Sequence, residues 1–87
     1  MNATDLVAAV DLGSNSFRML VAQVVKTPSG TQLRPIDTLR ESVRLAAGLT
    51  DNKLLGNDAY QRGIAAIRRF GERIRGFDPA NVRAILS

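Results

Sequence analysis

The sequence predicts an α/β fold in which an antiparallel three-stranded meander is followed by a helix and a further strand. Apolar runs separated by turn residues fill the first half of the chain. Near residue 57 the spacing of apolar residues changes to steps of three and four, which is typical of a helix. With 87 residues, 45% of them hydrophobic, the chain is long enough for one small folded domain.

Two nearly continuous apolar runs predict the first two strands. They are "DLVAAVDL", residues 5–12, and "SFRMLVAQVVK", residues 16–26. Such runs are typical of strands that are covered on both faces, so we expect both strands inside a sheet. The short polar connection around Gly13 has the length of a hairpin turn.

A third, more polar strand is predicted over residues 31–45, after the Pro- and Gly-containing turn at 27–30. Pro35 has no N–H to donate to a neighbouring strand, which favours an edge position or a break. A loop is predicted over residues 46–56, because Gly48 and Gly56 disfavour a regular helix or strand there.

The helix is predicted over residues 57–76, with Gly76 as its stop. Its expected apolar stripe consists of Tyr60, Ile64, Ile67, Gly71 and Ile74. A turn at 78–81 and a final strand at 82–87 follow.

The composition excludes several kinds of site. Without cysteine or histidine, the chain has no disulfide, no thiolate metal site and no imidazole base. A bound metal must suit carboxylate, hydroxyl and carbonyl oxygens, which favours Mg²⁺. There is no basic leader and no apolar run of ~18 residues, so we expect a cytoplasmic protein without a membrane partner.

The segment "AVDLGSNSFRML", residues 9–20, carries the candidate binding site. A phosphate cradle needs backbone N–H groups and small side chains, which this turn supplies together with two hydroxyls and an amide. The candidate phosphate-binding residues are Gly13, Ser14, Asn15, Ser16 and Arg18. Asp11, at the strand end, is the candidate metal ligand. A plain hairpin turn is the alternative, since Asn, Gly and Ser are common in turns.

Three stretches carry a resemblance to a known family: "AAVDLGSNSFRMLVAQV", "DTLRESVRLAAGL" and "RGIAAIRRFGERIRGFDPANVRAILS". They resemble the exopolyphosphatase and guanosine pentaphosphate phosphohydrolase family of the actin-like ATPase superfamily. The resemblance implies an incomplete ribonuclease-H-like domain. It also implies that residues 1–87 are the N-terminal part of the first actin-like ATPase domain, with no second domain present.

The resemblance also implies an activity. The parent enzyme would use Mg²⁺ to release terminal phosphate from inorganic polyphosphate or guanosine pentaphosphate, and a homodimer is possible. Asp11 would lie near the metal, Gly13 to Ser16 would form the first phosphate loop, and Arg18 would touch substrate. A charged stretch with Arg40, Glu41 and Arg44 matches residues near the cleft, although surface pairing explains it as well.

No catalytic base is assigned to this chain. In the family, the general-base glutamate, a second glycine-rich phosphate loop and a further metal-binding aspartate lie beyond the point where this sequence ends. Glu41 and Glu72 are the only glutamates, one in a strand and one in a helix, and neither is a credible base. We therefore expect the isolated chain to be inactive.

Two alternatives remain open. The net charge of +4 suits a polyanion, and Arg62, Arg69 and Arg73 fall on one helix face, as in a small nucleic-acid-binding module. A solvated face with Asp58–Arg62 and Arg68–Glu72 pairs explains that stripe more simply, and four aromatic residues are few for base stacking, so a nucleic-acid partner is unlikely. A different actin-like ATPase, such as a sugar kinase, is disfavoured by the Ser-Asn-Ser-Phe-Arg string.

Overall fold

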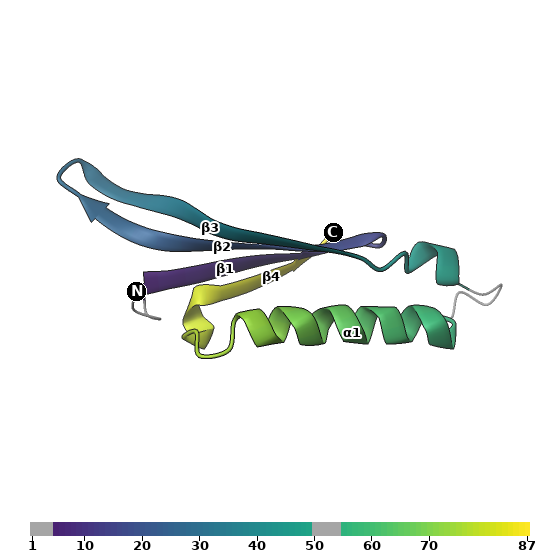
Figure 1. Ribbon diagram of the computed structural model, residues 1–87. Coiled ribbons are helices and arrows are strands. Elements are labelled where there is room, and N and C mark those ends of the chain that lie inside the picture. Colours follow the sequence, from purple (N-terminus) through teal and green to yellow (C-terminus); the bar gives the residue numbers. More distant parts are fainter. Residues whose placement is uncertain (1–4, 50–54) are drawn as a thin grey trace.

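The computed structural model describes residues 5–49 and 55–87, which form one sheet with one long helix packed along it (Figure 1). The elements in chain order are β1 (Leu6–Leu12), β2 (Ser16–Thr27), β3 (Gly30–Ser42), the 3-10 turn η2 (Ala46–Gly48), α1 (Asn57–Arg73), the 3-10 turn η3 (Pro79–Asn81) and β4 (Val82–Leu86). Residues 50–54 of the expected loop lie outside the described residues.

The sheet has the strand order β3-β2-β1-β4. β1, β2 and β3 pair antiparallel, which confirms the predicted meander, while β4 pairs parallel with β1. β3 is an edge strand, as Pro35 predicts. Val21 lies opposite Asp37 and Ala22 opposite Pro35, so Ile36 is left without a partner in a β-bulge.

The core lies between α1 and one face of the sheet. Its buried side chains are Ala8, Val10, Phe17, Met19, Val21, Val43, Ala66 and Phe70. On the helix, the buried residues are Ala59, Gly63, Ala66 and Phe70. The predicted stripe is therefore wrong: each buried position precedes the predicted one by one residue, so the helix is rotated about its axis relative to the prediction. Tyr60 is 53% exposed and Ile67 is 49% exposed. Ala66 and Phe70 belong to the core against the sheet, whereas Ala59 lies against Gly48 of η2 and Gly63 lies near Leu45.

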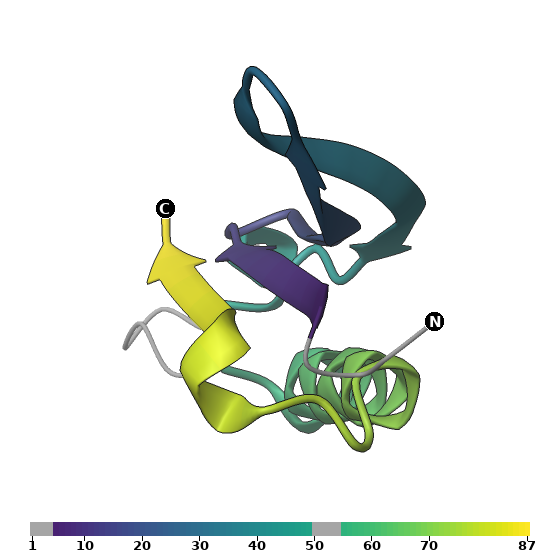
Figure 2. The ribbon, with the colours of Figure 1, turned by 90° about the vertical axis from the view of Figure 1, so that its left-hand side faces the viewer.

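The other face of the sheet is not covered by any described element. Figures 1 and 2 place α1 on one side of the sheet only. Ala9 is exposed on this face, and Leu20 and Ile85, which lie on the same face, are 42% and 62% exposed. The prediction that β1 and β2 are covered on both faces is therefore wrong for the described residues, because one helix can cover one side only. We call this side the open face.

The ends of two elements also differ from the prediction. α1 ends at Arg73, and Gly76 lies in the following turn with φ +88°, a conformation that favours glycine. β3 ends at Ser42 rather than at residue 45, because Arg44 turns the chain with φ +45°. None of the helices among the described residues is long and apolar enough to cross a membrane.

Candidate functional site

The turn between β1 and β2 consists of Gly13, Ser14 and Asn15, and the Gly13 N–H closes it by donating to the Ser16 carbonyl at 3.0 Å. Ser14 and Asn15 are exposed. Among the described residues, no hydrogen bond uses the backbone N–H of either one. The turn therefore offers two consecutive N–H groups to a ligand, as an anion cradle requires.

The carbonyls of the same two residues are held by the chain that follows β3. Asn15 O accepts from the N–H groups of Val43 (2.9 Å) and Arg44 (3.0 Å). Ser14 O accepts from Leu45 (2.7 Å) and Ala46 (3.2 Å). In a planar trans peptide the carbonyl and the next N–H point in opposite directions. The Asn15 N–H is therefore directed away from this support, toward the free side of the turn.

α1 fixes the supporting segment in turn. Arg62 Nε donates to the Val43 carbonyl at 2.8 Å, and its Nη2 donates to the Arg44 carbonyl at 3.2 Å. Arg62 was expected to be part of a solvated stripe, yet its guanidinium connects the helix to the residues that hold the turn. Local sequence patterns could not predict this contact, because Arg62 lies 19 residues from Val43 and 18 residues from Arg44 along the chain.

Asp11 lies at the end of β1 beside the last residue of the chain. Its Oδ1 accepts a hydrogen bond of 2.7 Å from Ser87 Oγ, and the Ser87 N–H donates to the Leu12 carbonyl at 3.1 Å. A methyl group at Gly13 would lie 2.9 Å from the Ser16 carbonyl oxygen and 3.4 Å from Ser87 Oγ. Ser87 is thus a site residue that the sequence patterns did not indicate; the parallel pairing of β4 with β1 brings it here.

The chemistry of a metal site is only partly present. Within residues 5–49 and 55–87, no group of three or more Asp, Glu, His or Cys side chains could hold a metal ion. Asp11 is exposed and has the Ser87 hydroxyl next to it. One carboxylate with hydroxyl oxygens fits Mg²⁺, which commonly keeps several waters and binds through one or two carboxylates together with substrate phosphates.

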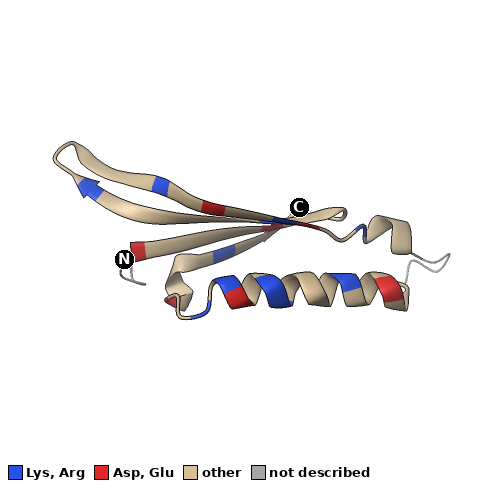
Figure 3. Ribbon diagram, in the orientation of Figure 1, with Lys and Arg blue, Asp and Glu red and all other residues tan. Residues whose placement is uncertain are grey.

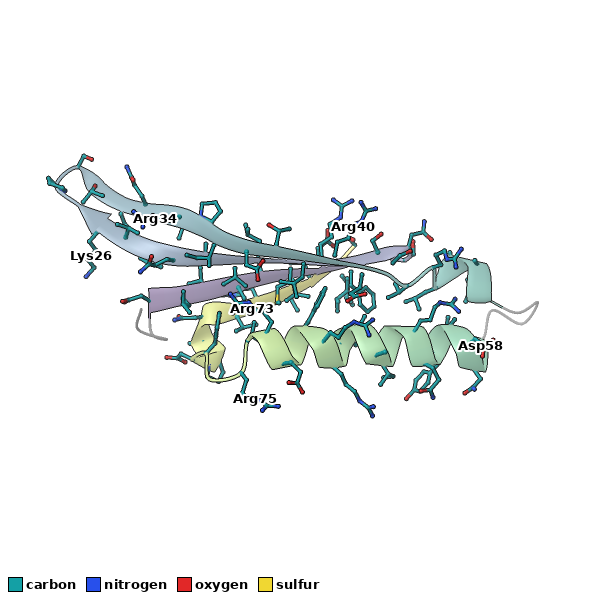
Figure 4. All side chains as sticks on the ribbon, in the orientation of Figure 1. Lys26, Arg34, Arg40, Asp58, Arg73 and Arg75 are labelled. Atoms are coloured by element: carbon teal, nitrogen blue, oxygen red, sulfur yellow. The ribbon has the colours of Figure 1, made fainter. Side chains whose placement is uncertain are left out.

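Asp11, Arg18 and Arg40 form a row across the sheet. Asp11 lies opposite Arg18, and Arg18 lies opposite Arg40, so all three project from the open face. Arg40 Nη2 donates to Ser16 Oγ at 3.4 Å. Figure 4 shows Arg40 on the side of the sheet away from α1, whereas Arg73 lies between sheet and helix.

The arginines of α1 do not form a free basic surface. Arg69 binds both carboxylate oxygens of Glu41, at 2.5 and 3.1 Å, and Arg73 Nε lies 2.9 Å from Asp37 Oδ2. Two acidic residues of β3 thus pair with two arginines of α1, and Figure 3 marks the positions of acidic and basic residues along both elements. Glu41 is directed toward the helix rather than toward the candidate site.

Two expected ion pairs within the helix are also absent from the described residues. Neither Asp58–Arg62 nor Arg68–Glu72 forms, and Glu72 pairs instead with Arg75 at 3.3 Å. The nucleic-acid interpretation loses its main support, because the arginines that suggested it contact β3 or the segment after it.

The fold defines the class of protein, an incomplete actin-like ATPase domain. Its features are a mixed sheet in the order β3-β2-β1-β4 and a glycine-containing hairpin at the end of β1. Residues 20–86 match the Ppx/GppA phosphatase family, which is more than half of the chain. The chain belongs to this family of hydrolases.

Individual relatives agree with this assignment. A Haemophilus influenzae protein assigned as an exopolyphosphatase is 39% identical over 79 residues, which are 91% of this chain and 23% of that protein. The structure of the Aquifex aeolicus PPX-GPPA enzyme matches with a TM-score of 0.74 and 26% identity, over 93% of this chain and 26% of the other. A Cytophaga hutchinsonii exopolyphosphatase structure, 18% identical with a TM-score of 0.64, shares the fold; the match covers 93% of this chain and 24% of the other. The chain therefore spans about a quarter of the length of these relatives.

Proposed function

We propose that this chain supplies the first phosphate-binding loop of a phosphohydrolase that releases terminal phosphate from inorganic polyphosphate or guanosine pentaphosphate. Residues 1–87 would be the N-terminal part of the first actin-like ATPase domain of such an enzyme. The observation that carries the proposal is the turn after β1: the N–H groups of Ser14 and Asn15 have no partner among the described residues, while four hydrogen bonds hold their carbonyls.

The side chains around the turn support the same role. Ser14 and Ser16 add hydroxyl donors, and Arg18 adds a guanidinium on the open face. Gly13 has no room for a side chain beside the Ser16 carbonyl, so only glycine fits where its N–H closes the turn. A guanidinium and backbone N–H groups make charge-assisted hydrogen bonds to phosphate, which are stronger than those between neutral groups.

In this proposal Asp11 holds Mg²⁺, directly or through water, next to the phosphate loop. When bound, the ion would neutralise charge on the phosphoryl oxygens. The Ser87 hydroxyl, which donates to Asp11 Oδ1, would keep the carboxylate oriented.

Phosphoanhydride hydrolysis also needs a positioned water and a base. Glu41 is bound to Arg69 on the helix side of the sheet and Glu72 to Arg75, so neither serves the turn. We therefore predict that the purified chain releases no phosphate from polyphosphate. Phosphate release that disappears in an Asp11→Asn variant would contradict this prediction.

Binding can be tested without turnover. The amide spectrum of the ¹⁵N-labelled chain would be recorded during titration with Mg²⁺ and short-chain polyphosphate. We expect the amide signals of Ser14 and Asn15 to shift, with a response that depends on Mg²⁺ and is lost in Asp11→Ala. Asp5→Ala removes the same charge ahead of the opposite end of β1 and should bind as the parent chain does. Signals at the turn that do not move would overturn the proposal.

The proposal includes a cytoplasmic location and allows a homodimer. It does not include nucleic acid, because Arg62, Arg69 and Arg73 are engaged within the fold. Neutralising Arg69 and Arg73 should leave polyphosphate binding at the turn intact in any variant that remains folded.

A further inference from the structure

Arg62 has a different kind of partner from the two arginines that follow it on the same side of α1. Arg69 and Arg73 each bind a carboxylate of β3, so their charges are compensated. Arg62 binds two carbonyl oxygens instead, those of Val43 and Arg44, at 2.8 and 3.2 Å. It forms no ion pair with a carboxylate of residues 5–49 or 55–87, and it is half-buried. Its positive charge is therefore uncompensated and less screened by solvent than a fully exposed charge.

Two peptide groups connect this guanidinium to the candidate anion site. The Arg44 carbonyl, which accepts from Arg62 Nη2, belongs to the same peptide group as the Leu45 N–H. That N–H donates to the Ser14 carbonyl at 2.7 Å. The Ser14 carbonyl shares its peptide group with the Asn15 N–H, which has no partner among the described residues. Since the carbonyl and N–H of a trans peptide point in opposite directions, this hydrogen-bonded series runs from α1 to the free side of the turn.

Hydrogen bonds in such a series strengthen one another. A cation bound to a carbonyl oxygen draws electron density toward that oxygen, which makes the N–H of the same peptide group a stronger donor. Condensed-phase estimates put the gain at roughly 10–30% per bond. Both peptide groups of the series are polarised in the same direction by Arg62, and the series ends at the Asn15 N–H.

We propose that Arg62 is a positioning residue whose charge, acting through these two peptide groups, raises the affinity of the Asn15 N–H for an anion. The inference rests on the proposed function, because the turn is taken there as the phosphate site. It goes beyond mechanical support of the turn, since a neutral donor at residue 62 would hold the same carbonyls but polarise the series less.

The first test separates charge from support at residue 62. Arg62→Gln keeps a side-chain N–H donor without the charge, and Arg62→Lys keeps the charge. Arg68→Gln removes the same charge from an exposed position of α1 and is the matched control. Orthophosphate is titrated into each ¹⁵N-labelled chain in the presence of Mg²⁺, with the Asn15 amide as readout. Dispersed spectra and slow exchange of the Leu45 amide establish that the support of the turn is retained.

We expect Arg62→Gln to weaken orthophosphate binding about threefold relative to Arg68→Gln, the size of a partial weakening of one hydrogen bond to an anion. Arg62→Lys should bind orthophosphate nearly as well as the parent chain. Without phosphate, base-catalysed exchange of the free Asn15 amide should be slower in Arg62→Gln, because a less polarised N–H is less acidic. Mechanical loosening of the turn would not slow this exchange. Equal affinities and equal Asn15 exchange rates in Arg62→Gln and Arg68→Gln would overturn the inference.

A second test uses the parent chain and needs no variant. Coupling between two sites is reciprocal, so an anion at the Asn15 N–H should strengthen the bonds along the series. The Leu45 amide and the Nε–H of Arg62 should both shift during the orthophosphate titration, whereas the Nε–H of Arg69, which binds Glu41, should not. A shift of the Asn15 amide without one at Arg62 would overturn the inference and leave the turn as a phosphate site. Turn amides that do not respond at all would overturn the proposed function, and this inference with it.

Discussion

At the scale of single residues, the turn after β1 leaves no space for a side chain at Gly13. A methyl group there would lie 2.9 Å from the Ser16 carbonyl oxygen, a backbone atom that is part of the closed turn. Gly71, in contrast, has open space around its position in the last turn of α1. Glycine is therefore required by space at residue 13, whereas the space around residue 71 would accept a side chain.

We predict that Gly13→Ala lowers the free energy of unfolding by about 1–3 kcal/mol, the usual cost of forcing extra atoms into a filled position. Gly71→Ala should raise it by up to about 1 kcal/mol, because alanine is the better helix former. Urea unfolding of the two variants and the parent chain measures both effects. A Gly13→Ala chain as stable as the parent would show that the turn relaxes freely.

At the same scale, Arg62 fixes the support of the turn. Its guanidinium binds the carbonyls of Val43 and Arg44, whose N–H groups hold Asn15 O. We predict that Arg62→Ala costs about 1–3 kcal/mol of stability, since carbonyls beside a part-buried contact lose a charged donor.

Hydrogen exchange of the backbone amides at residues 43–46 checks this role directly. Exchange should become faster in Arg62→Ala, which would loosen the turn. Arg68→Ala removes the same charge from an exposed position of α1 and should leave exchange unchanged. Equal protection in both variants would mean that the strand end holds the turn without the helix.

At the scale of elements, two ion pairs connect α1 to β3. Arg69 binds Glu41 through both carboxylate oxygens, and Glu41 is partly shielded, with a side-chain exposure of 28%. The Arg75–Glu72 pair is much more open, with side-chain exposures of 78% and 69%. Solvent screens the second pair more strongly, so the two should differ in strength.

A double-mutant cycle with alanine at Arg69 and Glu41 should give a coupling energy of about 0.5–1 kcal/mol, at the upper end for such pairs. The coupling should fall as salt is added. The same cycle at Arg75 and Glu72 serves as the matched control and should give a smaller coupling. A coupling near zero at Arg69 and Glu41 would show that α1 is held against β3 by apolar packing alone.

At the scale of the whole molecule, the two edges of the sheet differ. β3 carries Pro35 and a bulge at Ile36, both of which discourage pairing with another strand. β4 pairs with β1 alone in the described sheet and has a single charged residue, Arg83. Its Ile85 and Leu86 side chains are 62% and 83% exposed. The β4 edge is thus the edge that favours pairing with a second copy.

We predict that the chain forms dimers at rising concentration and that Ile85→Lys weakens them several-fold, because a lysine on an edge strand opposes pairing. Ile36→Lys puts the same charge on the bulged edge and should leave self-association unchanged. Sedimentation velocity over a concentration series measures both. A monomeric parent chain at all concentrations would contradict the prediction.

Much of this arrangement follows from the sequence by itself. The alternation of turns and apolar runs predicts the meander, and Pro35 predicts that its last strand lies at an edge. Gly13 to Asn15 predict the hairpin after β1. These features can be predicted because they depend on local backbone chemistry. The resemblance in the opening segment likewise indicates the Ppx/GppA phosphatase family, which the comparisons confirm.

Only the tertiary structure decided how these elements meet. Which stripe of α1 is buried, which acids its arginines bind and how Ser87 reaches Asp11 all depend on contacts between segments distant in sequence. Helical spacing marks several possible faces, and burial against a particular sheet selects one of them. The open face could not be predicted for the same reason. Apolar strands indicate that covering both faces of the sheet is favourable, but they do not indicate which element covers each face.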